Sequence, residues 1–156
     1  MSPKTLIGVI GVSEASEAEM QNAFEVGKLL GAMGLDMVCG GLGGVMEEAS
    51  RGCHQAGGIV LGILPGGEKN AANPFVSFAI PTNLGHSRNT VIAHTADLLI
   101  AIGTGYGTLS EIAIALKLGK KVLGLESWTV EGIQACRDLP EIEAALRDFL
   151  ASTSPP

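Results

Sequence analysis

The chain has 156 residues, a length that suits one domain with one sizeable core. Its formal net charge is −6 and it has no cluster of Lys or Arg, so we expect no nucleic-acid partner, because a phosphate backbone requires clustered positive charge. Hydrophobic residues make up 46% of the sequence and charged residues only 17%, which favours a sheet that is buried on both faces.

Short apolar runs alternate with segments of helical spacing along the whole chain. In chain order, we expect a strand at 6–12, a helix at 17–33, a strand at 35–39, a helix at 45–56, strands at 59–64 and 76–80, a helix at 86–95, a strand at 98–102, a helix at 109–118, a strand at 121–125 and a helix at 138–150. This alternation predicts an α/β protein with a single Rossmann-like, doubly wound parallel sheet and helices on both faces. Residues 1–150 are expected to form this domain, and residues 151–156 a disordered tail.

The sequence also bears on where the protein works. Its most apolar stretch, residues 91–107, contains His94 and Asp97, which argues against a membrane span. The three cysteines are an odd number without metal-ligand spacing, which favours a reducing compartment. We therefore expect a cytoplasmic protein with no membrane partner, no metal site and no required cofactor.

Two glycine-rich segments lie where a predicted strand gives way to a predicted helix. The first glycine loop comprises Gly40, Gly41, Leu42, Gly43 and Gly44, and the second glycine loop comprises Gly103, Thr104, Gly105, Tyr106, Gly107 and Thr108. Glycine allows the backbone to approach a ligand closely, and the N-terminus of the following helix attracts an anion. Because open parallel sheets bind ligands beyond the carboxyl ends of their strands, we expect the loops to hold a phosphate-bearing small molecule, such as a nucleotide, between them. The alternative is that the glycines only form tight turns.

Two common nucleotide motifs do not match these loops. Neither loop contains the lysine of a P-loop. Gly8 and Gly11 run into Ser13, and the second predicted strand ends at Cys39 instead of the acidic residue of a dinucleotide fingerprint. We therefore expect neither NAD nor ATP chemistry, and we keep Ser13 as a candidate ligand contact.

Charged residues near the loops are the candidates for chemistry. Glu111 follows Thr108 by three residues, so its carboxylate either faces the ligand cleft or completes a helix capping box with Thr108. Arg88 precedes a predicted helix, and its guanidinium suits bidentate recognition of phosphate, with a surface salt bridge as the alternative. Of Glu47 and Glu48, one is a candidate contact of a ribose hydroxyl, and we select Glu47 for this role. A solvated helix face is expected for at least one of the two.

Four segments match one known family in order and spacing. They are GGLGGVME at residues 40–47, GGIVLGILP at residues 57–65, SRN at residues 87–89 and GYGTLSE at residues 105–111. Together they resemble the Lonely Guy superfamily, which contains cytokinin riboside 5′-monophosphate phosphoribohydrolases. Within it, the chain is most similar to the branch of the molybdenum-cofactor carrier protein. The hydrolase branch has a Pro-Gly and an Arg-Lys pair where this chain has Gly103-Thr104 and Arg88-Asn89.

The resemblance to the hydrolases implies cleavage of the N-glycosidic bond of a nucleoside 5′-monophosphate to free base and ribose 5-phosphate. Gly105, Gly107 and Thr108 would then bind the 5′-phosphate. Glu111 would stabilise oxocarbenium-like charge or orient water, and Arg88 would assist the phosphate or the departing base. These are the two catalytic residues that the resemblance implies.

The resemblance to the carrier branch implies a different outcome at the same loops. They would hold a phosphorylated cofactor such as the molybdenum cofactor without breaking a bond, and Asn89 is a candidate contact. A nucleotide sensor is a third interpretation, so whether the chain is an enzyme stays open. Family members commonly form homo-oligomers, and we expect one here. Lysine decarboxylation, an older label of the family, is not expected, because the lysines lie away from the glycine loops.

Overall fold

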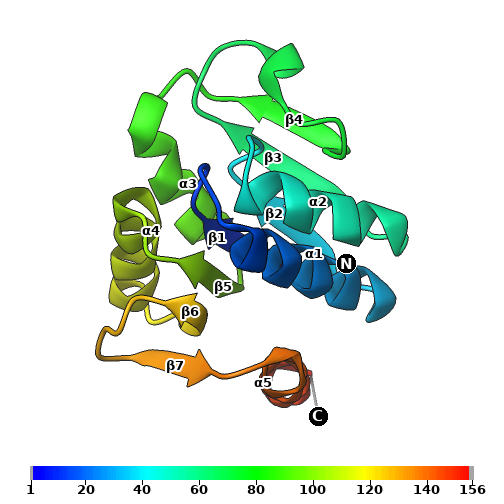
Figure 1. The fold of residues 1–156 in the computed structure, drawn as a ribbon, viewed down its shortest axis with the longest axis vertical. Helices are drawn as coiled ribbons and strands as arrows, with labels where there is room; N and C mark the ends of the chain where they lie inside the picture. Colours follow the sequence, from blue (N-terminus) through cyan, green and yellow to red (C-terminus); the bar gives the residue numbers. More distant parts are fainter. Residues whose placement is uncertain (1, 155–156) are drawn as a thin grey trace.

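The computed structural model describes residues 2–154, which contain one sheet of seven strands (Figure 1). The strands are β1 (Leu6–Gly11), β2 (Asp36–Cys39), β3 (Val60–Leu64), β4 (Phe78–Pro81), β5 (Leu98–Gly103), β6 (Lys121–Ser127) and β7 (Ile133–Cys136). They lie in the order β4-β3-β2-β1-β5-β6-β7, and every neighbouring pair is parallel. A parallel sheet of this kind needs cover on both faces.

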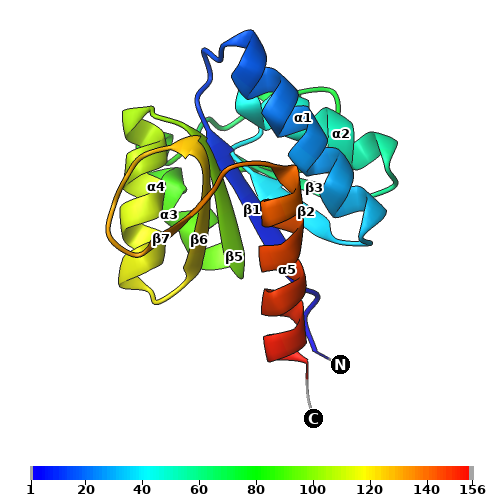
Figure 2. The ribbon, with the colours of Figure 1, turned by 60° about the horizontal axis from the view of Figure 1, so that its bottom comes forward.

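Helices supply that cover on both sides of the sheet (Figure 2). They are α1 (Glu17–Ala32), α2 (Val45–Gln55), α3 (Arg88–Thr95), α4 (Tyr106–Lys117) and α5 (Leu139–Thr153), with short 3₁₀ turns at Lys69–Ala71 and Gly85–Ser87. α1, α2 and α5 pack on one face around a core that includes Val9 and Leu30, and α3 and α4 pack on the other around Ile10 and Ile92. The predicted Rossmann-like, doubly wound α/β fold is therefore confirmed. None of the helices in residues 2–154 is long and apolar enough to span a membrane.

Glycines allow α1 and α2 to pack closely on their face of the sheet. A Cβ at Gly27 would overlap the carbonyl of Ala49, and a Cβ at Gly52 would overlap the carbonyl of Phe24. Each helix backbone thus lies directly against the other. This contact fixes α2, which begins directly after the first glycine loop.

Three differences between the structure and the predicted elements exceed two residues. The sequence does not predict β7, because Ile133–Cys136 contains only one large aliphatic residue. α4 begins at Tyr106, three residues earlier than predicted, because Gly105 acts as its N-cap residue. α5 continues to Thr153, so residues 151–153 are helical where the sequence predicts a disordered tail. Residues 155–156 of that expected tail lie outside the described residues.

Candidate functional site

A cavity of about 450 Å³ opens at the carboxyl ends of the central strands. Its walls come from the end of β1, the first glycine loop, Pro65 after β3, the start of α3 and the second glycine loop. The strand order reverses between β1 and β5, since β2 to β4 lie on one side of this pair and β6 and β7 on the other. Open α/β sheets bind ligands at this kind of switch point, and the volume is in the range of small-molecule and cofactor sites.

The second glycine loop brings the N-terminus of α4 to the cavity. Gly105 is the N-cap residue and its carbonyl accepts from the N–H of Leu109 at 3.0 Å, so the N–H groups of residues 106–108 have no partner within the helix. Thr108 is only 2% exposed, and its Oγ1 is a buried oxygen with no hydrogen-bond partner among residues 2–154. Buried polar groups are normally paired. The helix N-terminus and this hydroxyl therefore suit an oxyanion.

Two residues, one at the end of β6 and one directly after it, hold the second glycine loop from outside. The Oγ of Ser127 donates to the carbonyl of Gly103 at 2.7 Å, and the indole Nε1 of Trp128 donates to the carbonyl of Gly105 at 2.9 Å. Tyr106 is 83% exposed, and its ring centre lies 5.8 Å from that of Trp128. Of the predicted contacts in this loop, the cavity is lined by Gly105, Gly107 and Thr108, but not by Gly103, Thr104 or Tyr106.

The first glycine loop forms one wall of the cavity, and the first N–H of the helix that follows it already has a partner in the protein. The N–H of Val45, the first residue of α2, donates to the carbonyl of Val12 at 3.0 Å and so is already paired. Gly44 has a φ of 65°, and a Cβ there would overlap the carbonyls of Val12 and Ser13. Of the predicted glycines in this loop, Gly40 lines the cavity, whereas Gly41, Gly43 and Gly44 shape the turn outside it.

Arg88 and Glu111 bring opposite charges to the same cavity. Arg88 is 8% exposed and donates to Asn89, so it is not in a surface salt bridge. Glu111 is 6% exposed and lies in the second turn of α4. Because the N-cap residue of this helix is Gly105 and not Thr108, the capping-box interpretation of Glu111 is wrong. A surface salt bridge therefore does not account for Arg88, and a helix capping box does not account for Glu111.

The electrostatics of the cavity favour a protonated Glu111. Burial raises the pKa of the Glu111 carboxyl to about 8, although the positive charge of Arg88 opposes this rise. Burial also lowers the pKa of Arg88, but a guanidinium keeps its charge in proteins. The two side chains make no direct ion pair. The raised pKa favours the protonated carboxyl at neutral pH, and in this form Glu111 can donate a hydrogen bond to a ligand oxygen.

Sequence reasoning missed the apolar part of the wall. Ser13 and Asn89, two predicted ligand contacts, line the cavity. Apolar side chains and one ring complete the wall: Ile10, Val12, Leu42, Met46 and Pro65, with the exposed His86. The only sequence signal for such wall residues was their position, since Val12 and Pro65 stand at the carboxyl ends of predicted strands.

In the described part of the chain, no group of three His, Cys, Asp or Glu residues is placed to hold a metal ion.

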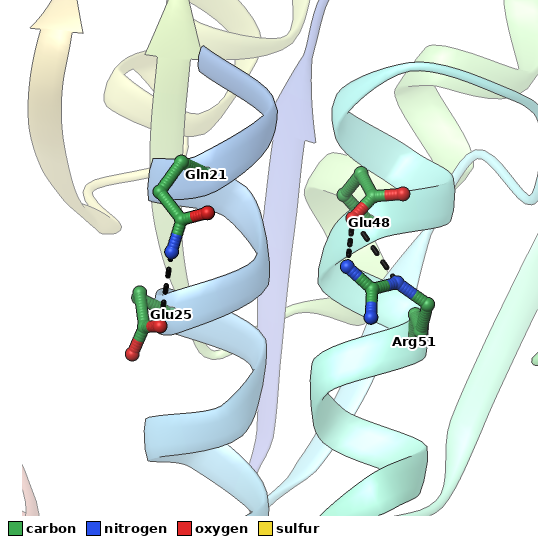
Figure 3. Close-up of polar contacts among 4 residues, drawn as sticks. All are labelled: Gln21, Glu25, Glu48 and Arg51. Atoms are coloured by element: carbon green, nitrogen blue, oxygen red, sulfur yellow. Dashed lines mark hydrogen bonds and ion pairs between the residues drawn. The ribbon is translucent and has the colours of Figure 1, made fainter. Parts of the chain in front are cut away.

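The two glutamates after the first glycine loop lie outside the cavity. Glu48 pairs with Arg51 at 2.6 Å on α2, close to α1, where Gln21 donates to Glu25 (Figure 3). Glu48 therefore lies in a salt bridge on the helix surface. Glu47 does not line the cavity either, so neither glutamate is placed to meet a ribose hydroxyl there.

The fold and the cavity define a Rossmann-like domain with a ligand-sized site at the switch point of its sheet. The chain matches the model of the SLOG cluster4 family over residues 4–147, and it belongs to that family. This membership, together with the relatives below, confirms the resemblance to the Lonely Guy superfamily.

Two relatives illustrate the range of similarity. An uncharacterized protein of Archaeoglobus fulgidus is 48% identical over 147 residues, which cover 94% of this chain and 95% of the relative. The cytokinin riboside 5′-monophosphate phosphoribohydrolase LOG of Oryza sativa subsp. japonica is 32% identical over 125 residues, which cover 74% of this chain and 51% of the relative. The chain thus spans about half the length of the hydrolase that it matches.

Solved structures match over nearly the whole chain. The molybdenum cofactor binding protein of Rippkaea orientalis has a TM-score of 0.91 at 31% identity, covering 96% of this chain and 99% of that one. The molybdenum cofactor carrier protein of Chlamydomonas reinhardtii has a TM-score of 0.88 at 32% identity, with the same coverage of 96% and 99%. These matches confirm the resemblance to the carrier branch of the superfamily.

Proposed function

We propose that the cavity binds a phosphorylated small molecule with its phosphate at the N-terminus of α4. The observation that carries this proposal is the buried Oγ1 of Thr108, which has no partner among residues 2–154 and lies on a residue that lines the cavity. A phosphate oxygen would accept from this hydroxyl and from the N–H groups of residues 106–108. Arg88 supplies a positive charge to the same ligand.

The ring system of the ligand would lie against the apolar wall. Leu42, Met46 and Pro65 line the cavity together and present no charge. Ligand sites typically bury the body of a ligand against apolar side chains and orient it with a few polar groups. The thioether of Met46 also adapts to irregular shapes. A phosphorylated heterocycle would match both parts of the cavity, with its phosphate at the N-terminus of α4 and its ring against the apolar wall.

We infer that this heterocycle is carried and not consumed, with a phosphorylated pterin such as the molybdenum cofactor as the cargo. The similarity to two molybdenum-cofactor proteins over 96% of this chain supports this inference, because the match to the hydrolase covers only half of that relative. The cavity volume of about 450 Å³ and the unpaired Thr108 hydroxyl fit a phosphorylated ring. A carrier needs only to bind and release this cargo.

Hydrolysis of a nucleoside 5′-monophosphate is the second candidate function, and the Arg88–Glu111 pair favours it. Water would add to C1′ of the ribose, the bond from C1′ to the base would break, and the base would leave with a proton. A protonated Glu111 would donate to a ribose hydroxyl or to the base, and an ionised Glu111 would stabilise positive charge on the sugar.

Calorimetric titration tests the phosphate site directly. AMP and a phosphorylated pterin are compared with adenosine and the unphosphorylated pterin, on the wild-type chain and on Thr108→Val, which keeps the shape of the side chain but lacks the hydroxyl. We expect the wild type to prefer each phosphorylated ligand, and Thr108→Val to weaken that preference by about tenfold. Equal affinity for ligands with and without phosphate would overturn the proposal.

Chromatography after incubation with AMP separates the two functions. Intact AMP, recovered in full alongside measurable binding, supports the carrier. Release of adenine that disappears in Glu111→Gln supports the hydrolase, since this variant keeps the size of the side chain but cannot ionise. Release that survives in Glu111→Gln would contradict both the carrier and a catalytic role of Glu111 in the hydrolase.

The expected homo-oligomer and cytoplasmic location remain predictions. Family members commonly assemble with themselves, and light scattering of the purified chain would measure the mass of the particle. The net charge of −6 supports the expected absence of nucleic acid from its partners. A gel-shift assay with single- and double-stranded DNA would check that absence.

A further inference from the structure

Arg88 is held by protein acceptors on several sides. Its Nε donates to the carbonyl of Ile63 in β3 at 2.9 Å, and its Nη2 lies 3.4 Å from the carbonyl of Gly40 in the first glycine loop. Its Nη1 donates to the Oδ1 of Asn89. A guanidinium has five N–H donors, so donors on the two terminal nitrogens remain for a ligand beyond these contacts with the described residues. The direction in which they point is set by the protein.

A one-way chain of hydrogen bonds runs on from Arg88 to the second glycine loop. The Nδ2 of Asn89 donates to the Oγ of Ser110 at 3.2 Å, and that Oγ donates to the carbonyl of Gly107 at 2.6 Å. Chemistry fixes these directions, because a guanidinium only donates and a carbonyl only accepts. Asn89 must therefore turn its Oδ1 to Arg88 and its Nδ2 to Ser110.

This chain connects two residues that line the cavity, Arg88 and Thr108. The C=O of Gly107 and the N–H of Thr108 belong to one planar trans peptide and point in opposite directions. Holding the Gly107 carbonyl therefore also sets the direction of the Thr108 N–H at the N-terminus of α4. Asn89 thus links the orientation of Arg88 to that of the Thr108 N–H.

We infer that Asn89 is a positioning residue which, together with Ser110, sets the Arg88 guanidinium and the Thr108 N–H to receive one phosphate group. This inference rests on the proposed function, because it takes the phosphate to bind at this site. Asn89 is 5% exposed and lies in the first turn of α3, facing the α4 residues that it contacts. Donors that are fixed in advance bind an anion without the entropic cost of ordering a long side chain.

Calorimetry with AMP as the probe measures this effect. Asn89→Leu keeps the approximate size of the side chain and removes its hydrogen bonds, and we expect it to weaken AMP binding about tenfold. Ser110→Ala breaks the same chain one step later and should weaken binding less. The double variant should bind no worse than Asn89→Leu, because both changes act on one chain. Thr90→Leu, at an exposed neighbouring position of α3, is the matched control and should bind like the wild type.

A spectroscopic readout needs no ligand. In the ¹⁵N-labelled wild type, a held guanidinium should give separate signals for Nη1 and Nη2 of Arg88, and Arg88→Lys identifies them among the four arginines. Asn89→Leu should broaden these signals and bring them together, because only the long 3.4 Å contact between Nη2 and the Gly40 carbonyl then opposes rotation about the Nε–Cζ bond. Thermal unfolding of each variant shows whether it is folded. If Asn89→Leu does not fold, Ser110→Ala carries the affinity test, and the wild-type signals alone decide whether Arg88 is held.

The outcomes distinguish the inference from the function on which it rests. If the wild type binds no phosphate monoester, the proposed function fails, and the ligand-free signals still decide whether Asn89 holds Arg88. If AMP binds the wild type and a folded Asn89→Leu equally, the positioning role is overturned and the proposed function stands. Merged Arg88 signals in the wild type would also overturn it. A change in stability alone, without a change in affinity, would leave Asn89 with a purely structural role.

Discussion

Arg88 and Glu111 line the same cavity, yet the Arg88 guanidinium bonds to Ile63, Asn89 and Gly40 and not to the Glu111 carboxyl. Without a direct partner, the buried carboxyl keeps its proton to a higher pH, and burial is the larger cause of its raised pKa. A carboxyl in this state lowers the stability of the fold at neutral and basic pH. Ligand sites often contain groups that lower the stability of the fold in this way.

The first prediction concerns stability against pH. The pKa of Glu111 is about 8 in the folded chain and near its ordinary value of 4.5 in the unfolded chain. The folded state therefore binds more protons between these two values, and the contribution of Glu111 to stability falls as the pH rises from 4.5 through about 8. We expect Glu111→Gln to be more stable than the wild type at about pH 9, by on the order of 3–5 kcal/mol.

Urea unfolding at two pH values checks this prediction. At about pH 4, where Glu111 is protonated in both states, the variant and the wild type should have similar free energies of unfolding. The difference should open above that pH and level off beyond about pH 8. A constant difference between the two proteins at every pH would show that Glu111 titrates normally, and would contradict its burial without a partner.

The second prediction concerns ligand binding against pH. When Glu111 ionises, it adds a negative charge to a cavity that is proposed to hold a phosphate. AMP should therefore bind more weakly as the pH rises through about 8, and the loss should be about tenfold. Calorimetry across this range provides the measurement, with Glu111→Gln as the control. The variant should show no loss in this range, and a parallel loss in both proteins would assign the effect to another group.

Much of the fold could be predicted from the sequence because its strands are continuous apolar runs. β5, Leu98–Gly103, is buried throughout and contains no polar residue, so its sequence indicates a buried strand. β7, Ile133–Cys136, is at the edge of the sheet and only Cys136 in it is buried, so its sequence carries little hydrophobic signal. Its pairing with β6 depends on tertiary structure, which overrides weak local preference.

Site residues whose role depends on their chemical type could be predicted from the sequence. Residues whose role depends on the shape of the cavity were harder to predict. Arg88, Glu111 and Thr108 could be selected because each is polar and follows a strand-to-helix junction. The roles of Gly40 and Gly44 could not be separated, because the same glycine can face a ligand or avoid a backbone clash. The apolar wall was missed, since Leu42 and Met46 look like any core residues in sequence.

The third prediction separates two glycines of the first glycine loop. Gly44→Ala should lower the free energy of unfolding by about 3 kcal/mol or more, because its φ of 65° is strained for alanine and the new Cβ would overlap the carbonyls of Val12 and Ser13. Gly43→Ala is the matched control. Its Cβ would come no closer than 3.9 Å to Glu47, so the change should stay within about 1 kcal/mol. Denaturant unfolding measures both, and equal losses would show that the first glycine loop can shift to relieve the overlap.

The fourth prediction concerns the support of the second glycine loop. Trp128→Phe keeps an aromatic ring beside Tyr106 but loses the N–H that donates to Gly105 at 2.9 Å. Gly105 is the N-cap residue of α4, so the loss should loosen the turn that is proposed to bind the phosphate and weaken AMP binding about fivefold, while the fold stays intact. Calorimetry and thermal unfolding give the two quantities, and Tyr106→Phe, which removes only a hydroxyl from an exposed ring, is the control. Unchanged affinity in Trp128→Phe would mean that the turn holds its geometry without the indole, and that Trp128 contributes only to packing.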